Sequence, residues 1–163
     1  MADSDPTPPN LLFLAAANPA LSSTGSPEWD RRFARWLMLD GLARADIDFG
    51  ACARANEAHE LVKLRIEETY GRDWRSDPEA TKEREATWKD VTTADDQRST
   101  ELLEPLWQAA IDLALVPAPN LPAALFKIEL IKREELDNYT AMTRDPFEIV
   151  AEDMANLIKG AAQ

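Results

Sequence analysis

Apolar side chains recur every three or four positions between residues 29 and 64, which is the spacing of one face of an α-helix. The positions on this face are Trp29, Phe33, Trp36, Leu39, Ala43, Ile47, Ala51, Ala55, Ala58, Leu61 and Leu64. Ser26 and Pro27 mark its start, because a serine side chain can cap free amides and proline suits the first helical position. The pattern therefore predicts helix from Pro27 onward, with one long apolar face.

Three glycines shape this first helix. Gly71 is a plausible end, since glycine accepts the backbone conformation that closes a helix. Gly41 and Gly50 weaken the interior, so we expect a kink near one of them. The segment is therefore either one long helix or two nearly collinear helices.

A second long helix is predicted from Pro78, again after a capping residue, Asp77. Its apolar positions are Trp88, Val91, Leu102, Leu103, Leu106, Trp107, Ala110 and Leu113. Pro105 either kinks this helix or marks a break, because proline removes the backbone hydrogen bond to the residue four positions back. Ser99 is a possible cap for a separate second piece, and both alternatives stay open.

Two shorter helices follow. Asn120 caps one that we expect to run over about 121–137, and the run 145–148 (DPFE) fits a capping box that opens the last, with Gly160 at its end. No segment alternates with period two, so no strand is predicted. Together the patterns predict an all-α protein, in which residues 27–160 form an antiparallel helical hairpin or bundle of two long and two shorter helices.

Residues 1–26 are expected to form an extended N-terminal arm, because prolines recur along them. The middle of the arm is apolar: Leu11, Leu12, Phe13 and Leu14. A purely disordered tail would be polar, so we expect the arm to dock on its own domain or on another molecule. Two aspartates and no Lys or Arg precede the apolar run, which does not fit a secretory signal, and the run is too short to span a bilayer.

The formal net charge is -12, from 30 acidic and 18 basic residues. Such a surface disfavours nucleic acid and anionic membranes as partners, because both need Lys and Arg counter-charges. It suits a partner with a basic surface. With the single cysteine, Cys52, no intrachain disulfide can form, which fits a reducing compartment. We therefore expect a cytoplasmic protein without membrane contact.

Candidate chemistry is sparse. His59 lies in an EAHE run, but the zinc-protease helix motif needs a second histidine where Lys63 stands, so we expect a surface or boundary histidine. Cys52 lies about two helical turns from His59, too far for a nucleophile and its base, so it is expected to be a small core residue. These patterns predict no catalytic residue, no metal site and no cofactor.

Three aspartates interrupt the first helix: Asp40, Asp46 and Asp48. Paired carboxylates can perform acid–base chemistry or hold a cation. Arg44 lies one turn from both Asp40 and Asp48, which favours salt bridges instead. Glu57 and Glu60 complete the carboxylates that a bundle enzyme would use.

Two further features stand out. Lys127, Lys132 and Arg133 form a small basic spot that neighbouring glutamates balance. Trp74 lies in a polar turn, where it either folds back onto the hairpin or stays exposed as a partner contact, since tryptophan is enriched at binding hot spots.

The C-terminal half has a characteristic order of segments: LWQAAIDLALV, the proline loop PAPNLPAAL, FKIELIKREEL and DPFEIVAEDMANL. This order resembles small uncharacterised helical bacterial proteins, some of them associated with prophages, in which a lysine occupies the helix after the loop, here Lys127. The resemblance covers residues 29–160 in outline. It implies the helical fold and implies no activity.

These observations favour a protein–protein interaction, structural or adaptor protein without catalytic activity. Its candidate partner contacts are Leu11, Leu12, Phe13, Leu14 and Trp74. The partner is expected to be another protein or a second copy of this chain. Two alternatives stay open: an acidic mimic of nucleic acid that inhibits a DNA-binding protein, and a small helical-bundle enzyme that uses carboxylates.

Overall fold

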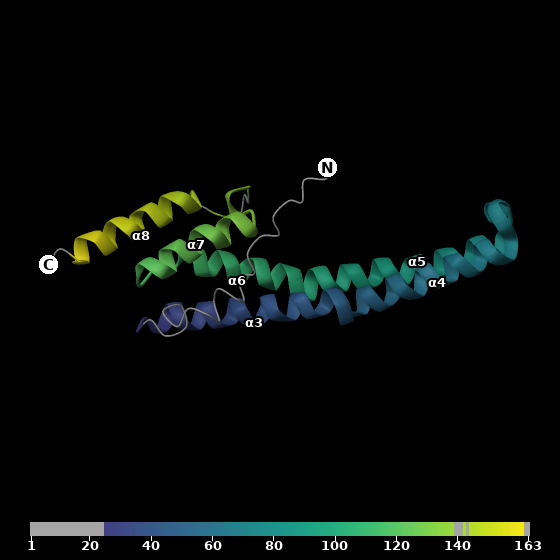
Figure 1. Ribbon diagram of the computed structural model, residues 1–163, viewed down its shortest axis with the longest axis horizontal. Helices are drawn as coiled ribbons and strands as arrows, with labels where there is room; N and C mark the ends of the chain where they lie inside the picture. The colour runs from purple at the N-terminus through teal and green to yellow at the C-terminus, as the bar shows by residue number, and fades with distance from the viewer. Residues whose placement is uncertain (1–24, 139–141, 143, 162–163) are drawn as a thin grey trace, which may run out of the picture. The chain divides into compact units, whose positions relative to one another are not determined.

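The computed structural model describes residues 25–138, 142 and 144–161, and these residues form helices and turns with no strand (Figure 1). The all-α prediction is therefore confirmed. The predicted N-terminal arm lies outside the described residues up to position 24. The helical elements are α3 Pro27–Phe49, α4 Ala51–Tyr70, the 3-10 helix η1 Gly71–Ser76, α5 Pro78–Arg98, the π-helical η2 Ser99–Leu103, α6 Glu104–Leu115, α7 Leu121–Arg133, the 3-10 helix η3 Leu136–Asn138 and α8 Pro146–Ala161.

Two compact units make up the chain. Unit 1 contains Met1–Asp40 and Leu106–Gln163, and unit 2 contains Gly41–Pro105. Unit 1 thus holds the first half of α3 together with α7, α8 and most of α6. Unit 2 holds the end of α3, all of α4, η1, α5 and η2.

The first long helix breaks at Gly50, one of the two glycines expected to kink it. Gly50 is extended (φ -71°, ψ 175°), so α3 ends at Phe49 and α4 starts at Ala51. The side chain of Asp46 folds over Gly50 and occupies the space that a Cβ atom would need there. Because the Asp46 side chain approaches the backbone so closely here, only glycine fits at position 50.

The turn between α4 and α5 follows the predicted capping residues. Gly71 has a positive φ of 67°, and its amide donates to the carbonyl of Glu67 to close α4. Asp77 then opens α5, because its Oδ1 accepts from the amides of Glu79 (2.9 Å) and Ala80 (3.0 Å). Both predictions, the end at Gly71 and the start after Asp77, are confirmed.

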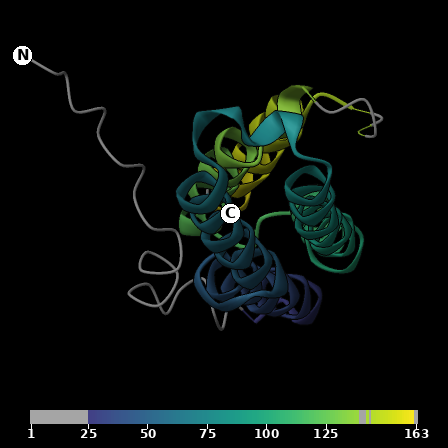
Figure 2. The same ribbon diagram turned by 90° about the vertical axis from the view of Figure 1, so that its right-hand side faces the viewer.

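Helices α4 and α5 lie side by side and run antiparallel within unit 2 (Figure 1). Three contacts fix their register: an ion pair from Arg65 to Glu83, a hydrogen bond between His59 Nδ1 and Thr87 Oγ1 (2.8 Å), and a contact from Cys52 Sγ to Asp95 Oδ1 (3.9 Å). From one contact to the next, the residue number on α4 decreases while the residue number on α5 increases, as an antiparallel pair requires. Figure 2 shows this hairpin from the end at which η1 connects the two helices.

The interior of this hairpin is small. Ile66, Trp74 and Ala80 form one buried cluster, against which Val62 packs, and Val91 and Ala94 are buried farther along α5. Ile47, Leu61 and Leu64, which belong to the apolar pattern of the first helix, are exposed. Two packed helices bury only the sides that face each other, so apolar side chains on their other sides stay in solvent.

The region around Pro105 is a distortion of a continuous helix. Ser99 keeps α-helical angles (φ -56°, ψ -53°), and the amide of Glu104 donates to the carbonyl of Ser99, five residues back. Because the proline ring crowds the preceding turn and cannot donate a hydrogen bond, a wider π-helical turn accommodates it. Ser99 therefore does not start a separate helix.

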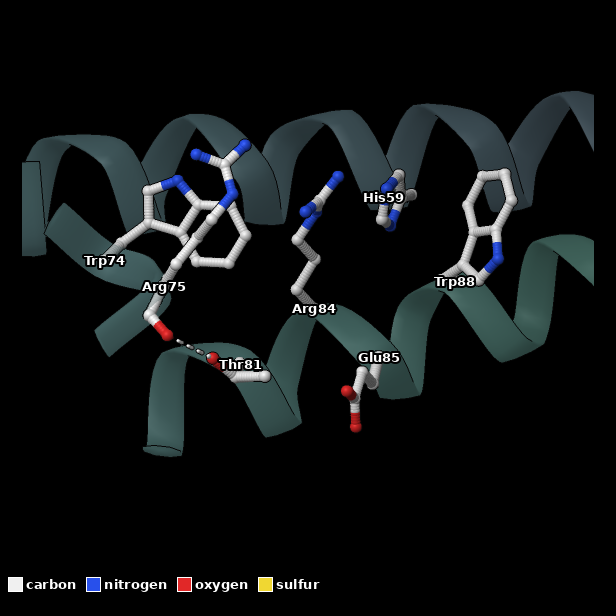
Figure 3. A pocket seen from close by; sticks show the side chains of 7 residues that line it. All are labelled: His59, Trp74, Arg75, Thr81, Arg84, Glu85 and Trp88. Atoms are coloured by element: carbon white, nitrogen blue, oxygen red, sulfur yellow. Dashed lines mark hydrogen bonds between the residues drawn. The ribbon is translucent and has the colours of Figure 1, made fainter. Parts of the chain in front are cut away.

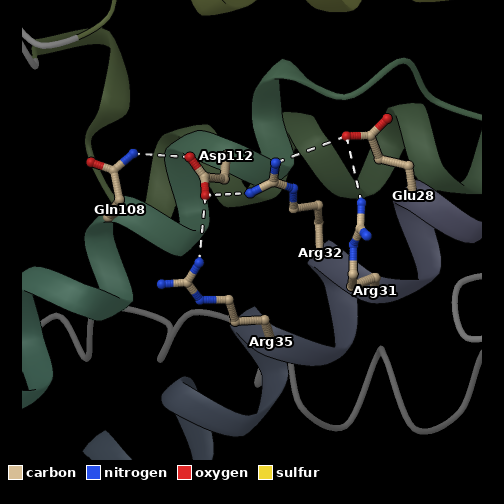
Figure 4. Close-up of polar contacts among 6 residues, drawn as sticks. All are labelled: Glu28, Arg31, Arg32, Arg35, Gln108 and Asp112. Atoms are coloured by element: carbon tan, nitrogen blue, oxygen red, sulfur yellow. Dashed lines mark hydrogen bonds and ion pairs between the residues drawn. The ribbon is translucent and has the colours of Figure 1, made fainter.

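In unit 1 the core begins with an aromatic cluster. Trp29, Phe33 and Trp36 occupy one face of α3, and the rings of Phe33 and Trp36 each meet Phe126 of α7 edge-on at 5.3 Å. Asp112 of α6 is held by Arg32 (2.6 Å) and Arg35 (3.7 Å) of α3 (Figure 4). The predicted apolar face of the first helix is thus confirmed over its N-terminal half.

Helix α7 starts as predicted, with Asn120 Oδ1 accepting from the amide of Ala123 (2.9 Å). It ends at Arg133, four residues before the expected end, because Glu135 takes a positive φ of 51° that a helix cannot contain. Helix α8 starts after Asp145, whose Oδ1 accepts from the amide of Phe147 (2.8 Å), and runs through Gly160 to Ala161.

Candidate binding site

The hairpin of unit 2 carries apolar side chains that nothing in the described chain covers. On α4, Leu61 is 61% exposed and Leu64 is 60% exposed. Because residues three apart on a helix are neighbours, these two form one patch, here called the outer row, on the side of α4 away from α5. Trp88 of α5 is 55% exposed. A monomer gains nothing by exposing leucines side by side in this way, so the outer row is a candidate contact surface.

A pocket of about 450 Å³ opens in the same unit, near the η1 turn (Figure 3). It is lined by His59 of α4, by Trp74 and Arg75 of η1, and by Thr81, Arg84, Glu85 and Trp88 of α5. Three elements therefore contribute to the wall of this cavity, here called the Trp74 pocket. It is open enough to admit part of another molecule.

Trp74 forms an anchored wall of this pocket. The side chain is only 7% exposed and packs in the cluster with Ile66 and Ala80. Of the two outcomes expected for this residue, it folds back onto the hairpin. Any part it takes in partner binding would therefore be as a wall of the pocket.

Two arginines flank the ring of Trp74. The guanidinium carbons of Arg75 and Arg84 both lie 4.8 Å from the ring centroid, within cation–π range. Within the part of the chain that the structure describes, neither guanidinium forms an ion pair. The same holds for Arg72 of this unit, whereas Arg65 forms an ion pair with Glu83.

His59 is buried between the two helices, so the expectation of a surface or boundary histidine was wrong. Its Nδ1 lies 2.8 Å from Thr87 Oγ1, and its ring lies 5.4 Å from that of Trp88. The hydroxyl of Thr87 already donates to the backbone carbonyl of Arg84 (3.1 Å). When the hydroxyl donates to this carbonyl, its oxygen is available to accept from Nδ1 of His59.

The candidate carboxylates are not brought together. Asp40 pairs with Arg133 in unit 1, whereas Asp46 pairs with Arg98 (2.8 Å) in unit 2. Asp48 and Glu57 are exposed. Glu60 is also exposed and receives a hydrogen bond from Lys63 (2.9 Å), which holds the pKa of this carboxyl below its ordinary value. Across the described ranges, no three His, Cys, Asp or Glu side chains form a group that could hold a metal ion.

Cys52 is partly exposed and lines a second cavity of about 460 Å³ at the Gly50 break. The expectation of a buried core cysteine was therefore wrong.

Lys127 does not belong to a surface basic spot. Its side chain is fully buried, and its Nζ donates to Asp153 Oδ2 of α8 at 2.5 Å. Burial lowers the pKa of Lys127, and the hydrogen bond that it donates to Asp153 opposes part of that effect. Sequence spacing could not show this pair, because 26 residues separate its members. The pair holds α7 to α8 and lies in the core of unit 1.

The apolar arm residues Leu11, Leu12, Phe13 and Leu14 lie outside the described residues, so their docking stays a prediction. None of the helices seen in the described part has the length and apolar character needed to cross a membrane. Comparisons with protein-family models, with curated proteins and with solved structures find no match to this chain. The resemblance to small helical bacterial proteins therefore also stays a prediction.

Proposed function

We propose that this protein is an interaction or adaptor protein that binds a partner protein through the hairpin of unit 2. The observation that supports the proposal most strongly is the outer row, in which Leu61 and Leu64 are both more than half exposed on one side of α4. Covering the exposed part of two such leucines would contribute about 1–2 kcal/mol each to association. A partner helix with its own apolar stripe would complete a three-helix arrangement over α4.

The rest of the unit is consistent with this role. The register of α4 against α5 is fixed by contacts between their facing sides, from Arg65–Glu83 at one end to Cys52–Asp95 at the other. The outer row takes no part in those contacts. A partner can therefore cover Leu61 and Leu64 without rearranging the hairpin, which keeps the cost of binding low.

The N-terminal arm is a second proposed contact. Its apolar run at Leu11–Leu14 lies between prolines, from which we expect an extended chain. An extended apolar segment docks readily in a groove between helices. The arm would then add to the affinity that the outer row provides.

Photo-crosslinking tests the hairpin contact. A photoreactive amino acid replaces Leu64 in the full-length chain, and the matched control replaces Lys89, which is exposed on α5. We expect irradiation in the native cells to give a discrete adduct with one other protein from position 64 and none from position 89. No adduct from position 64, or an adduct only with a second copy of this chain, would show the proposal to be wrong.

A further inference from the structure

The Trp74 pocket places two positive charges beside one tryptophan ring. Arg75 comes from η1 and Arg84 from α5, yet both guanidinium groups reach the same indole ring. Figure 3 shows the side chain of Arg84 between Trp74 and His59, on the side of the pocket that leads toward Trp88. A site of this kind favours a ligand that carries negative charge on or beside an apolar body.

Arg84 is also incompletely satisfied. Its Nε is buried and has no hydrogen-bond acceptor among the residues described. A buried donor without an acceptor is unfavourable, and a carboxylate is the acceptor whose geometry best matches a guanidinium group. The charge of Arg84 acts on the carboxyl group of Glu60, but no carboxylate among the described residues forms an ion pair with either arginine of the pocket.

Trp88 supplies the apolar part of the site. It is 55% exposed and lies against the ring of His59, so one large aromatic surface is available to a ligand. Arg84 and Trp88 are four residues apart on α5, which puts them about 6 Å apart along the helix axis. A ligand that uses both must carry its carboxylate and its apolar group at about that separation.

We propose that the Trp74 pocket binds a segment of the partner protein in which an acidic residue lies close to an aromatic one. The carboxylate is held by Arg75 and Arg84, and the aromatic ring packs against Trp88. Residues two apart in an extended segment, or four apart on a helix, have the required separation. This inference rests on the proposed function, because it identifies the chemistry of the partner.

Glu85 sets a limit on the site. Its carboxylate lines the same pocket and repels an incoming acid. It therefore favours ligands whose carboxylate approaches from the side of Trp74. Removing the charge of Glu85 should strengthen binding of an acidic segment, which is an effect that damage to the fold would not produce.

The test uses the full-length protein and a short labelled peptide in which one serine separates a glutamate from a phenylalanine. Binding is followed by fluorescence anisotropy at several salt concentrations. We expect Arg84→Gln or Arg75→Gln to weaken binding roughly tenfold or more at every salt concentration, since each removes a charge-assisted hydrogen bond. Glu85→Gln should strengthen it several-fold. Arg72→Gln is the matched control, because Arg72 is exposed on η1 and is not among the residues that line the pocket.

Several outcomes would overturn the inference. These are equal binding of a peptide with glutamine in place of glutamate, equal loss in Arg72→Gln and Arg84→Gln, and weaker binding by Glu85→Gln. Equal affinity for free phenylpropionate would show that the pocket takes a small aromatic acid, not a protein segment. Because Glu85→Gln removes no contact to Trp74, its result stands even if an arginine variant fails to fold.

The two proposals fail separately. An adduct from position 64 without binding of the acidic peptide would remove the ligand assignment and leave the proposed function in place. Peptide binding that depends on Arg84, without an adduct from position 64, would assign the pocket and remove the outer row as the partner contact.

Discussion

Lys127 is the residue whose environment differs most from what its type suggests. A fully buried ammonium group is unfavourable unless it is paired, and here Asp153 supplies the pair at 2.5 Å. The ammonium also lies 5.9 Å from the ring centroid of Trp29. The pair is therefore a structural link between α7 and α8.

Removing one member of this pair should be costly. We expect Lys127→Met to destabilise the protein by about 3–5 kcal/mol, because Asp153 would be left as an unpaired buried charge. Lys127→Met with Asp153→Leu should recover most of that loss. Urea unfolding measures both, with Lys132→Met as the control, since Lys132 is exposed. If Lys127→Met alone were as stable as the wild type, this account would be contradicted.

The same pair predicts how stability depends on pH. Burial lowers the pKa of Lys127 in the folded state below 10.5, so the unfolded chain binds the proton more tightly. The resulting penalty on folding is present in full below the folded pKa. It disappears as the pH rises through the folded pKa toward 10.5.

The contribution of Lys127 to the free energy of unfolding should therefore rise with pH in the alkaline range. Urea unfolding of the wild type and of the Lys127→Met, Asp153→Leu double variant at increasing alkaline pH isolates this contribution. The difference between the two should shift in favour of the wild type as pH rises. A shift in the opposite direction would mean that the pKa of Lys127 is raised in the fold.

At the scale of elements, Gly71 and Gly41 offer a matched comparison. Gly71 has a positive φ of 67°, whereas a Cβ atom at Gly41, inside α3, would meet open space. We expect Gly71→Ala to cost about 1–2 kcal/mol of stability and Gly41→Ala to add about 0.5–1 kcal/mol. Thermal unfolding of the two variants decides this. Equal effects would mean that the backbone at Gly71 is not under this constraint.

The outer row and the buried cluster of unit 2 should respond differently to substitution. Leu61→Ser with Leu64→Ser should change the free energy of unfolding by no more than about 0.5 kcal/mol, because both side chains are exposed. Ile66→Ala should cost about 2–5 kcal/mol, because Ile66 is buried in the same helix. A large loss in the double serine variant would show that the outer row packs within the fold.

The elements also show what the sequence can and cannot predict. The helix starts after Asp77 and Asn120 and the end at Gly71 were predictable, because each depends on contacts within a few residues. The exposure of Leu61 and Leu64 was not, since helical spacing does not tell how many neighbours a helix has. The Trp74 pocket was also missed, because it joins α4, η1 and α5 and depends on the register of the hairpin. The local sign of this pocket in the sequence was an arginine, Arg75, directly after Trp74.

At the scale of the whole molecule, the charge of -12 and the pocket of unit 2 favour different contacts. The acidic surface in general repels acidic partners, whereas Arg75 and Arg84 attract a carboxylate over a short range. Long-range repulsion falls with salt more than the contact within the pocket does, because exposed charges are screened most. Partner selection would therefore depend on the local chemistry of the hairpin.

The arm gives a prediction at this scale. If Leu11–Leu14 contribute to partner binding, a chain without residues 1–26 should bind the crosslinked partner more weakly than the full-length chain does. Its hairpin should keep the same thermal stability, because helix α3 begins only at Pro27. A comparison of the two affinities by calorimetry checks this, and equal affinities would restrict the contact to the hairpin.

The most direct test of the central claim is the affinity of the full-length protein for the partner captured from position 64, measured for the wild type and for Leu61→Ser with Leu64→Ser. The account predicts that the double variant loses at least about thirtyfold in affinity, as the loss of two leucines covered by the partner implies. Lys82→Ser with Lys89→Ser, on the exposed side of α5, should bind as the wild type does. Wild-type affinity in the leucine variant would contradict the claim that unit 2 binds its partner through the outer row.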